Sequence, residues 1–174
     1  MGLADFQYTA GVMGRSSLAN DTPGARRAVS YIASDGTVTN EPQIQHRIYN
    51  GLGAASVTGG AYVIAYDGDE ETNPKFILPV TAAFDSECCV TPAIVADATW
   101  SWVVTAGYVD ALVEGTTDVV KDDFLKVTQA NGASFITDTS TRSADSMAIA
   151  TAGQTSATPT LTKIFILGGA HDVD

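Results

Sequence analysis

Residues that usually carry catalysis, metal binding or membrane insertion are scarce in this sequence. It contains two histidines, two cysteines and nine basic residues among 174. No run of 18 or more apolar residues occurs, which argues against a transmembrane helix. The N-terminus lacks both the basic flank and the apolar stretch of a signal peptide. We therefore expect a soluble protein that is made in a cytoplasm and has no membrane partner.

The cysteines and histidines are not spaced like a reactive or metal-binding site. Cys88 and Cys89 are adjacent, and a bridge between neighbours would strain the disulfide and the peptide between them. Two reduced thiols that serve as small core hydrophobes are therefore predicted. The alternative, a redox switch or half of a metal site, needs further soft ligands, yet His46 and His171 lie far away in sequence. No G-x-S-x-G elbow is present either, so we expect no enzyme, no bound metal and no cofactor.

One acidic loop offers an alternative cation site. The stretch "YDGDEETN" at 66–73 holds four carboxylates between Asp67 and Glu71, and calcium is bound by such oxygen ligands. The twelve-residue spacing and the distal Glu of a calcium loop are missing. A solvated acidic turn between two strands is therefore favoured, and "KDD" at 121–123 is interpreted in the same way.

Charge is distributed unevenly along the chain. Residues 1–60 hold four arginines and four acidic residues, so they are neutral overall. Residues 61–174 hold five basic and sixteen acidic residues, and they account for the whole net charge of −11. Nucleic acids and anionic membranes are bound through basic patches, so an acidic body disfavours both as partners.

The sequence pattern predicts a compact all-β protein, an antiparallel β-sandwich or barrel. Short segments rich in Val, Ile, Thr, Tyr and Phe recur between Gly, Asp, Asn and Pro turns, and none gives a convincing long amphipathic helix. "SDGT" at 34–37 and "ANGA" at 130–133 predict two hairpins, because D-G and N-G pairs suit tight turns. The predicted strands are 29–34, 45–50, 61–66, 75–80, 93–98, 101–106, 108–114, 124–128, 134–138, 147–152 and 161–167.

"TWSW" at 99–102 places Trp100 and Trp102 on one face of a strand, because side chains alternate along a strand. Such a pair can form a stacking platform for a sugar. Packing in the core or in a subunit interface explains the pair equally well. We predict that both tryptophans are mostly buried, and carbohydrate stacking stays open as the alternative.

The first 28 residues differ from the remainder, which we assign to one β-domain at 29–174. Their apolar side chains follow neither the helix nor the strand period, and they carry three of the nine basic residues. Apolar side chains that fit no local core usually have a partner elsewhere. We therefore predict an extended N-terminal arm, residues 1–28, that contacts a partner. The residues expected to make these contacts are Phe6, Tyr8, Met13, Arg15, Leu18, Arg26 and Arg27.

Four stretches together resemble the small β-domains of tailed-bacteriophage capsid decoration, or cement, proteins. They are "IYNGLGAASVTGGAYVIAYD" (48–67), "NPKFILPVTA" (73–82), "WVVTAGYVDALVEGTTDVVKDDFLKVTQANGASF" (102–135) and "SMAIATAGQTSATPTLTKIFIL" (146–167). The steps of the family pattern fall on Asn50, Gly53, Gly60, Val63, Pro79, Gly107, Val109, Val113, Gly115, Lys121, Asp123, Leu125, Val127, Gly132, Ala133, Ala148 and Ala150. The chain departs from the pattern at Asp122, where the family usually has Gly.

The resemblance implies a structural protein of the virion. Such a protein is made in the host cell cytoplasm, binds the major capsid protein on the outer surface of an icosahedral head, and clamps neighbouring capsid subunits. It is often a trimer or another homo-oligomer on the capsid. Two alternatives remain open, a tail or baseplate component and a carbohydrate-binding adhesion module.

Overall fold

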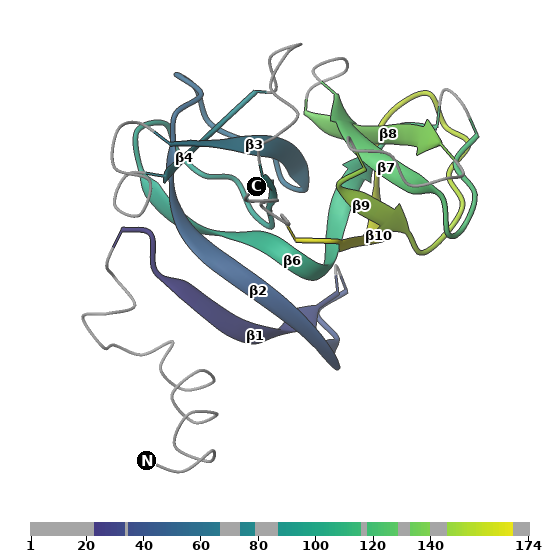
Figure 1. Cartoon of the computed structure of the whole chain (residues 1–174), viewed down its shortest axis with the longest axis horizontal. Helices are drawn as coiled ribbons and strands as arrows, with labels where there is room; N and C mark the ends of the chain where they lie inside the picture. The colour runs from purple at the N-terminus through teal and green to yellow at the C-terminus, as the bar shows by residue number, and fades with distance from the viewer. Residues whose placement is uncertain are drawn as a thin grey trace, which may run out of the picture.

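The computed structural model describes residues 23–33, 35–66, 74–78, 87–115, 118–128, 133–139 and 146–168. These residues form ten β-strands and no helix, so the predicted compact all-β fold is confirmed (Figure 1). In this part of the chain there is accordingly no helix that is long and apolar enough to cross a membrane. The strands are β1 (Arg26–Ile32), β2 (Val38–Asn50), β3 (Gly60–Tyr66), β4 (Pro74–Ile77), β5 (Cys88–Thr91), β6 (Trp100–Val113), β7 (Phe124–Thr128), β8 (Ser134–Thr139), β9 (Ala148–Ala150) and β10 (Thr160–Ile166).

The strand pairings form two closed circuits that share β6. In the first circuit β2 pairs with β4, β4 with β3, β3 with β5, β5 with β6, and β6 again with β2. In the second, β6 pairs with β10, β10 with β9, β9 with β7, β7 with β8, and β8 again with β6. All pairings are antiparallel except β2 with β4 and β6 with β8. Figure 1 shows β3 and β4 at the left and β7, β8 and β9 at the right, with β6 running from one group to the other.

Strand β6 can serve both circuits because it is 14 residues long. Its first half pairs with β2, from Trp100 opposite Tyr49 to Gly107 opposite Gln43. Its second half pairs with β10, from Gly107 to Val113. Strand β1 pairs with β2 and stands at the end of the strand order.

The two circuits enclose two hydrophobic clusters. The side chains of β3 alternate, so Tyr62 and Ile64 join one cluster while Ala61 and Val63 join the other. The smaller cluster also holds Ile48, Phe76, Cys89, Val95, Val103 and Ala133. The larger cluster holds Val109, Val113, Leu125, Phe135, Ile164 and Ile166 among others. Because both faces of β3 and β5 are covered, these strands lie in the centre of the molecule.

Both cysteines are free and buried, which confirms the prediction of two reduced thiols. They are neighbours on β5, so their side chains point to opposite faces of that strand. Cys88 packs in the larger cluster and Cys89 in the smaller. Each thiol acts as a small apolar side chain in its own core.

The two predicted hairpins are confirmed. The first joins β1 to β2, with Gly36 at a φ of 85° and the Thr37 amide bonded to the Asp35 carboxylate at 2.8 Å. The second joins β7 to β8, where Thr128 stands opposite Ser134. The left-handed φ in the first turn is the conformation for which glycine has no steric cost.

Three strand predictions need correction. Residues 93–98 are an irregular loop. The Asn50 side chain donates to the carbonyls of Val95 and Ala96, both at 3.1 Å, so these carbonyls accept from a side chain instead of from a neighbouring strand. Strand β5 was missed, since its four residues include two cysteines rather than strong strand formers. The strands predicted on either side of Gly107 are one continuous strand, β6.

Most of the predicted arm, residues 1–22, lies outside the described residues. Its last part does not extend away from the domain, because β1 begins at Arg26. Arg26 stands opposite His46, Arg27 opposite Gln45 and Ala28 opposite Ile44. The expected boundary between residues 28 and 29 therefore falls inside a paired strand.

Candidate functional site

The most distinctive surface lies on β1, β2 and β6, and we call it the Arg27–Trp102 face. Strand register brings its side chains together, because residues opposite each other in an antiparallel pair share a face. Arg27 stands opposite Gln45, Arg47 opposite Trp102, and Tyr49 opposite Trp100. The face consists of Arg27, Gln45, Arg47, Tyr49, Trp100 and Trp102, all partly exposed.

Arg27 is held in one place by two neighbours. Its guanidinium carbon lies 4.2 Å from the ring centroid of Trp102, in the geometry of a cation–π contact. Its Nε and Nη2 donate to the Gln45 side-chain oxygen at 2.9 and 2.7 Å. The Gln45 amide donates in turn to the Gln43 oxygen at 2.9 Å, and the Gln43 amide donates to the Tyr108 carbonyl at 2.8 Å. A chain of hydrogen bonds therefore fixes the position of this cation.

A second cation lies near Arg27. Partial burial and the neighbouring charge of Arg47 lower the pKa of the Arg27 guanidinium from its ordinary value. An arginine nonetheless stays protonated in proteins, so the face carries two like charges close together. By contrast Arg26, on the opposite face of β1, has a carboxylate partner, Glu87, at 3.4 Å.

The tryptophans are neither buried in the core nor fully exposed. Each is partly buried, and neither belongs to a hydrophobic cluster, so the structure does not place them in the core, and packing in a subunit interface stays a prediction. Trp100 meets the ring of Tyr49 edge to face, with centroids 5.5 Å apart at 63°. One ring face of Trp102 is covered by Arg27. The two indoles thus form part of a cationic and aromatic surface.

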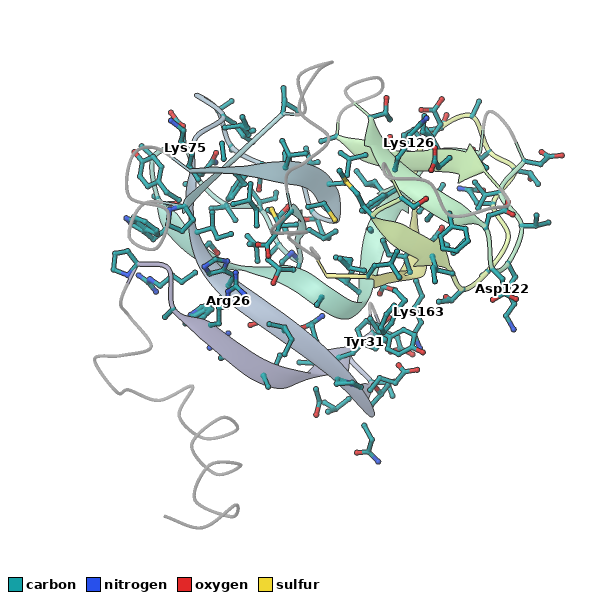
Figure 2. All side chains as sticks on the ribbon, in the orientation of Figure 1. Arg26, Tyr31, Lys75, Asp122, Lys126 and Lys163 are labelled. Atoms are coloured by element: carbon teal, nitrogen blue, oxygen red, sulfur yellow. The ribbon has the colours of Figure 1, made fainter. Side chains whose placement is uncertain are left out.

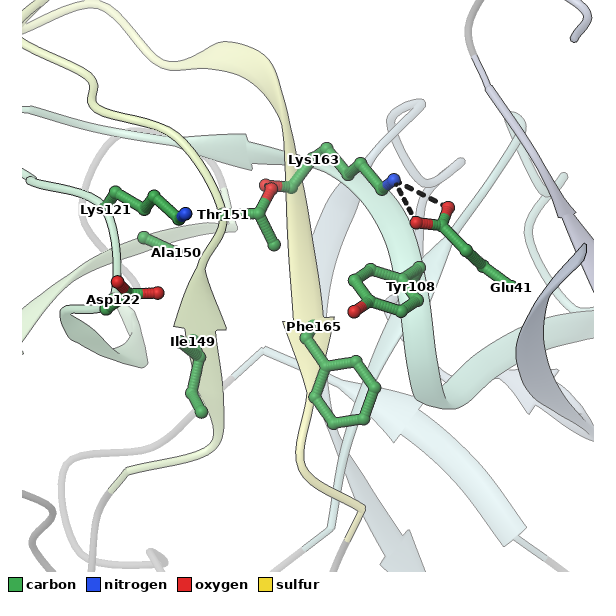
Figure 3. A pocket seen from close by; sticks show the side chains of 9 residues that line it. All are labelled: Glu41, Tyr108, Lys121, Asp122, Ile149, Ala150, Thr151, Lys163 and Phe165. Atoms are coloured by element: carbon green, nitrogen blue, oxygen red, sulfur yellow. Dashed lines mark hydrogen bonds and ion pairs between the residues drawn. The ribbon is translucent and has the colours of Figure 1, made fainter. Parts of the chain in front are cut away.

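A pocket of about 480 Å³ lies where β2, β6, β9 and β10 meet (Figure 3). Tyr108 and Phe165 meet in it edge to face, with ring centroids 4.9 Å apart. The remaining lining residues are Glu41, Lys121, Asp122, Ile149, Ala150, Thr151 and Lys163. Its two lysines and two carboxylates leave its lining without a dominant charge.

Asp122 reaches the rim of this pocket from a strained backbone. Its φ is 74°, a left-handed conformation that glycine adopts most easily and that Asp tolerates better than most residues. Its amide donates to the Ala150 carbonyl at 2.8 Å, which holds the turn against β9. The resemblance predicts Gly at this position, and a left-handed φ is the conformation that glycine adopts without steric cost.

His46 lies on β2 opposite Arg26 of β1 and is buried, with 4% of its surface exposed. Burial, with the nearby charge of Arg26, lowers the pKa of its imidazole. Its Nδ1 has no hydrogen-bond partner in the described structure. Burial therefore favours the neutral form of the ring.

The predicted contact residues fall into two groups. Arg26 and Arg27 lie on β1, and only Arg27 belongs to the face defined above. Phe6, Tyr8, Met13, Arg15 and Leu18 lie outside the described residues, as does most of the 66–73 loop. In the described ranges no three His, Cys, Asp or Glu side chains gather as they would around a metal ion.

The sequence interpretation missed Gln45, Arg47 and Tyr49. They occupy alternate positions of "QHRIYN", a segment that the sequence predicts as a strand, so a shared face could have been inferred. Only the pairing of β2 with β6 turns that alternation into a surface with Trp100 and Trp102.

Comparison of the chain with family models, curated proteins and solved structures gives no match.

Proposed function

We propose that the chain is a structural protein of a phage particle that binds the outer surface of an icosahedral capsid and stabilises it by clamping neighbouring capsid subunits. One observation carries the proposal. Seven of the seventeen residues on which the resemblance to capsid decoration proteins rests are buried in one hydrophobic cluster, and Pro79 and Gly132 lie outside the described residues. Val63, Val109, Val113, Leu125, Val127, Ala148 and Ala150 all pack in the larger cluster.

The asparagine and two of the glycines in the family pattern, Asn50, Gly107 and Gly115, are each required by a local contact. The buried Asn50 side chain donates to the carbonyls of Ala54 and Val95 at 2.9 and 3.1 Å. Gly107 has a φ of 90°, and a β-carbon there would collide with the Pro42 carbonyl oxygen. A β-carbon at Gly115 would collide with the carbonyl oxygen of Gln154. These requirements support the likeness as one of folds, and the role in the particle comes from the family.

The charge of the protein agrees with an exterior position. A net charge of −11 suits a body that faces solvent at high local density. Many copies on one lattice also give strong overall attachment from weak individual contacts. No chemical step is required of such a protein.

Cryo-electron microscopy of particles of the virus that encodes the chain tests the proposal. Density for the two-circuit fold on the outside of the head, at sites that bridge capsid subunits, is the expected result. Density in the tail or baseplate would establish the alternative structural role. Particles without the chain would overturn the proposal altogether.

A deletion series tests the contribution of the N-terminal segment. The deletion must end at residue 22, because removal of residues 1–28 would also remove Arg26, Arg27 and Ala28 from their pairing with β2. We expect deletion of residues 1–22 to leave thermal unfolding nearly unchanged and to weaken binding to undecorated heads sharply. A truncated chain that still saturates heads at the wild-type concentration would exclude this segment as the clamp.

A glycan-binding adhesion module is the second candidate. The observation that favours it is the group of three partly exposed aromatic rings, Tyr49, Trp100 and Trp102, on one face. Glycan-array binding that is lost in Trp102→Ala would support it. Absence of glycan binding by the wild-type protein would count against it.

A further inference from the structure

The Arg27–Trp102 face contrasts with the rest of the protein in charge. The body carries the whole net charge of −11, yet Arg27 and Arg47 lie together on this face. Among the described residues, the contacts of Arg27 are the Gln45 amide and the Trp102 ring, and neither is an anion. An arginine whose described contacts include no anion attracts carboxylates.

Arg27 is also preorganised to receive an anion. Its hydrogen bonds to Gln45 use Nε and Nη2, and the Nη1 protons take no part in them. Stacking on Trp102 restricts the side chain, so little further conformational freedom is lost when a ligand binds. The pKa of Arg27 is lowered by burial and by Arg47, which means that an added negative charge would relieve unfavourable terms already present.

The face lies beside an open strand edge. Strand β1 stands at the end of the strand order and pairs only with β2 in the described part of the chain. An extended polypeptide can add to such an edge through main-chain hydrogen bonds. Alternate side chains of the added strand would then lie on the same face as Arg27, because side chains alternate along a strand.

These observations favour a polypeptide over a glycan or a nucleic acid. Sugars and bases would need open ring faces for stacking, but Arg27 covers one face of Trp102 and Tyr49 contacts Trp100 edge to face. A glycan or a nucleic acid also cannot form the ladder that the edge of β1 offers.

We infer that the Arg27–Trp102 face and the adjoining edge of β1 form a docking site for an extended acidic polypeptide segment, in which Arg27 binds a carboxylate. This inference goes beyond the proposed function, because it requires no virus particle. In a capsid the segment would belong to a neighbouring subunit. The site can be tested with the purified chain alone.

The probe is a fluorescein-labelled decapeptide of alternating Glu and Thr, titrated with the full chain and followed by fluorescence anisotropy. Two matched peptides serve as controls. One has Gln in place of Glu, and the other has Pro in place of Thr, so that it keeps its charge but cannot form a strand ladder. We expect both controls to bind at least about 10-fold more weakly. Equal binding of the Gln peptide or of the Pro peptide would overturn the inference.

Neighbouring arginines on β1 supply a matched pair of variants. Arg27→Gln and Arg26→Gln each remove one positive charge from the same strand, but the two side chains lie on opposite faces. We expect Arg27→Gln to weaken binding about 10-fold, Arg27→Lys to weaken it less, and Arg26→Gln to change it by less than about 2-fold. Similar losses in the Arg27→Gln and Arg26→Gln variants would reduce the effect to net charge and overturn the assignment.

A measurement on the wild-type protein covers the case in which Arg27→Gln fails to fold. In heteronuclear NMR spectra, the Glu-Thr decapeptide should shift the backbone amides of β1 and the indole N–H of Trp102. Unshifted β1 amides at saturating peptide would overturn the inference. Tighter binding of a hyaluronan oligosaccharide or of oligo-dT than of the decapeptide would assign the face to a glycan or a nucleic acid instead.

Discussion

Lys163 donates to both carboxylate oxygens of Glu41, at 2.7 and 2.6 Å, across 122 positions of the sequence. The same ammonium lies 5.0 Å from the ring centroid of Tyr31 and 4.7 Å from that of Tyr108. Figure 2 shows Tyr31 and Lys163 side by side at the lower edge of the body. The Tyr31 hydroxyl in turn donates to Asp110 at 2.7 Å. This group of side chains ties the far end of the β1–β2 hairpin to β6 and β10.

Glu41→Gln should lower the free energy of unfolding by about 1 kcal/mol. This value lies at the upper end for partly exposed ion pairs, because the ammonium donates to both carboxylate oxygens. Urea denaturation followed by fluorescence measures it. The comparison variant is Arg26→Gln, which breaks an ion pair whose arginine side chain is 56% exposed and should cost less than about 0.5 kcal/mol. A larger loss in Arg26→Gln would contradict this ranking.

Gly107→Ala should lower the free energy of unfolding by about 3 kcal/mol. It combines a φ of 90° with a β-carbon that would collide with the Pro42 carbonyl oxygen and lie 3.0 Å from the Cα of Gln43. Gly53→Ala is the matched control, because Gly53 has a φ of 72° but open space around its Cα. The control should cost only the backbone strain, about 1 kcal/mol. Equal losses of stability in Gly107→Ala and Gly53→Ala would contradict the prediction, because they would mean that β2 can move away from β6 to make room for the β-carbon.

Asp122→Gly should leave the protein as stable as the wild type or stabilise it by up to about 1 kcal/mol. Glycine removes the left-handed strain at a φ of 74°, although it also gives the unfolded chain more freedom. Asp122→Ala should instead lower stability by about 1 kcal/mol, since Ala lacks the tolerance of Asp for this conformation. Thermal unfolding ranks the three proteins, and an Ala variant more stable than the Gly variant would contradict the assignment of strain.

Both thiols should be inert in the folded protein. Burial raises the pKa of Cys88 to about 12 and that of Cys89 well above its ordinary value, so very little thiolate is present at pH 8. We expect Ellman's reagent to react orders of magnitude more slowly with the native protein than in guanidinium chloride. Fast labelling under native conditions would show that β5 opens to solvent.

The buried imidazole of His46 should make stability depend on pH in a defined direction. Its pKa is lowered in the folded state, while an unfolded histidine titrates near pH 6.5. As the pH falls, the unfolded state therefore binds the proton before the folded state does. The free energy of unfolding is unaffected by His46 above about pH 6.5, and below that pH it decreases by up to about 1.4 kcal/mol per pH unit.

Urea denaturation between pH 7.5 and 5.5 measures this loss, and His46→Gln should show a flatter profile than the wild type. A wild-type profile that is flat over this range, or an NMR titration that places the folded pKa above 6.5, would contradict it.

Local patterns in the sequence were sufficient for the fold class and for both hairpins. Asp35 with Gly36 marks the first turn by local chemistry alone, and β7 and β8 have strand-forming residues on both sides of the second. The loop at 93–98 was mistaken for a strand because it contains Ile94 and Val95 in a short apolar stretch. Ile94 is 68% exposed and Val95 is 5% exposed, and Val95 is the one buried residue of these six. What removes the segment from the sheet is Asn50, which lies more than forty residues earlier.

The candidate site was only half predictable for a similar reason. Trp100, Trp102 and Arg27 each carry a recognisable local signal. The Arg27–Trp102 face exists because β2 places its own side chains between β1 and β6. Such pairing between distant segments depends on how the whole sheet closes, and no short window of sequence contains that information.

The shared strand has a consequence for the nascent chain on the ribosome. All strands of the first circuit have been synthesised once β6 leaves the ribosome. The second circuit cannot close until β10, which begins at Thr160, has also been synthesised. During that interval the C-terminal half of β6 is an unpaired edge, the kind that joins other nascent chains. Asp110 within this half and Glu114 directly after it place negative charge on the waiting edge. Charges at such positions act as gatekeepers against premature pairing, and we expect these two carboxylates to have that effect before the second circuit forms.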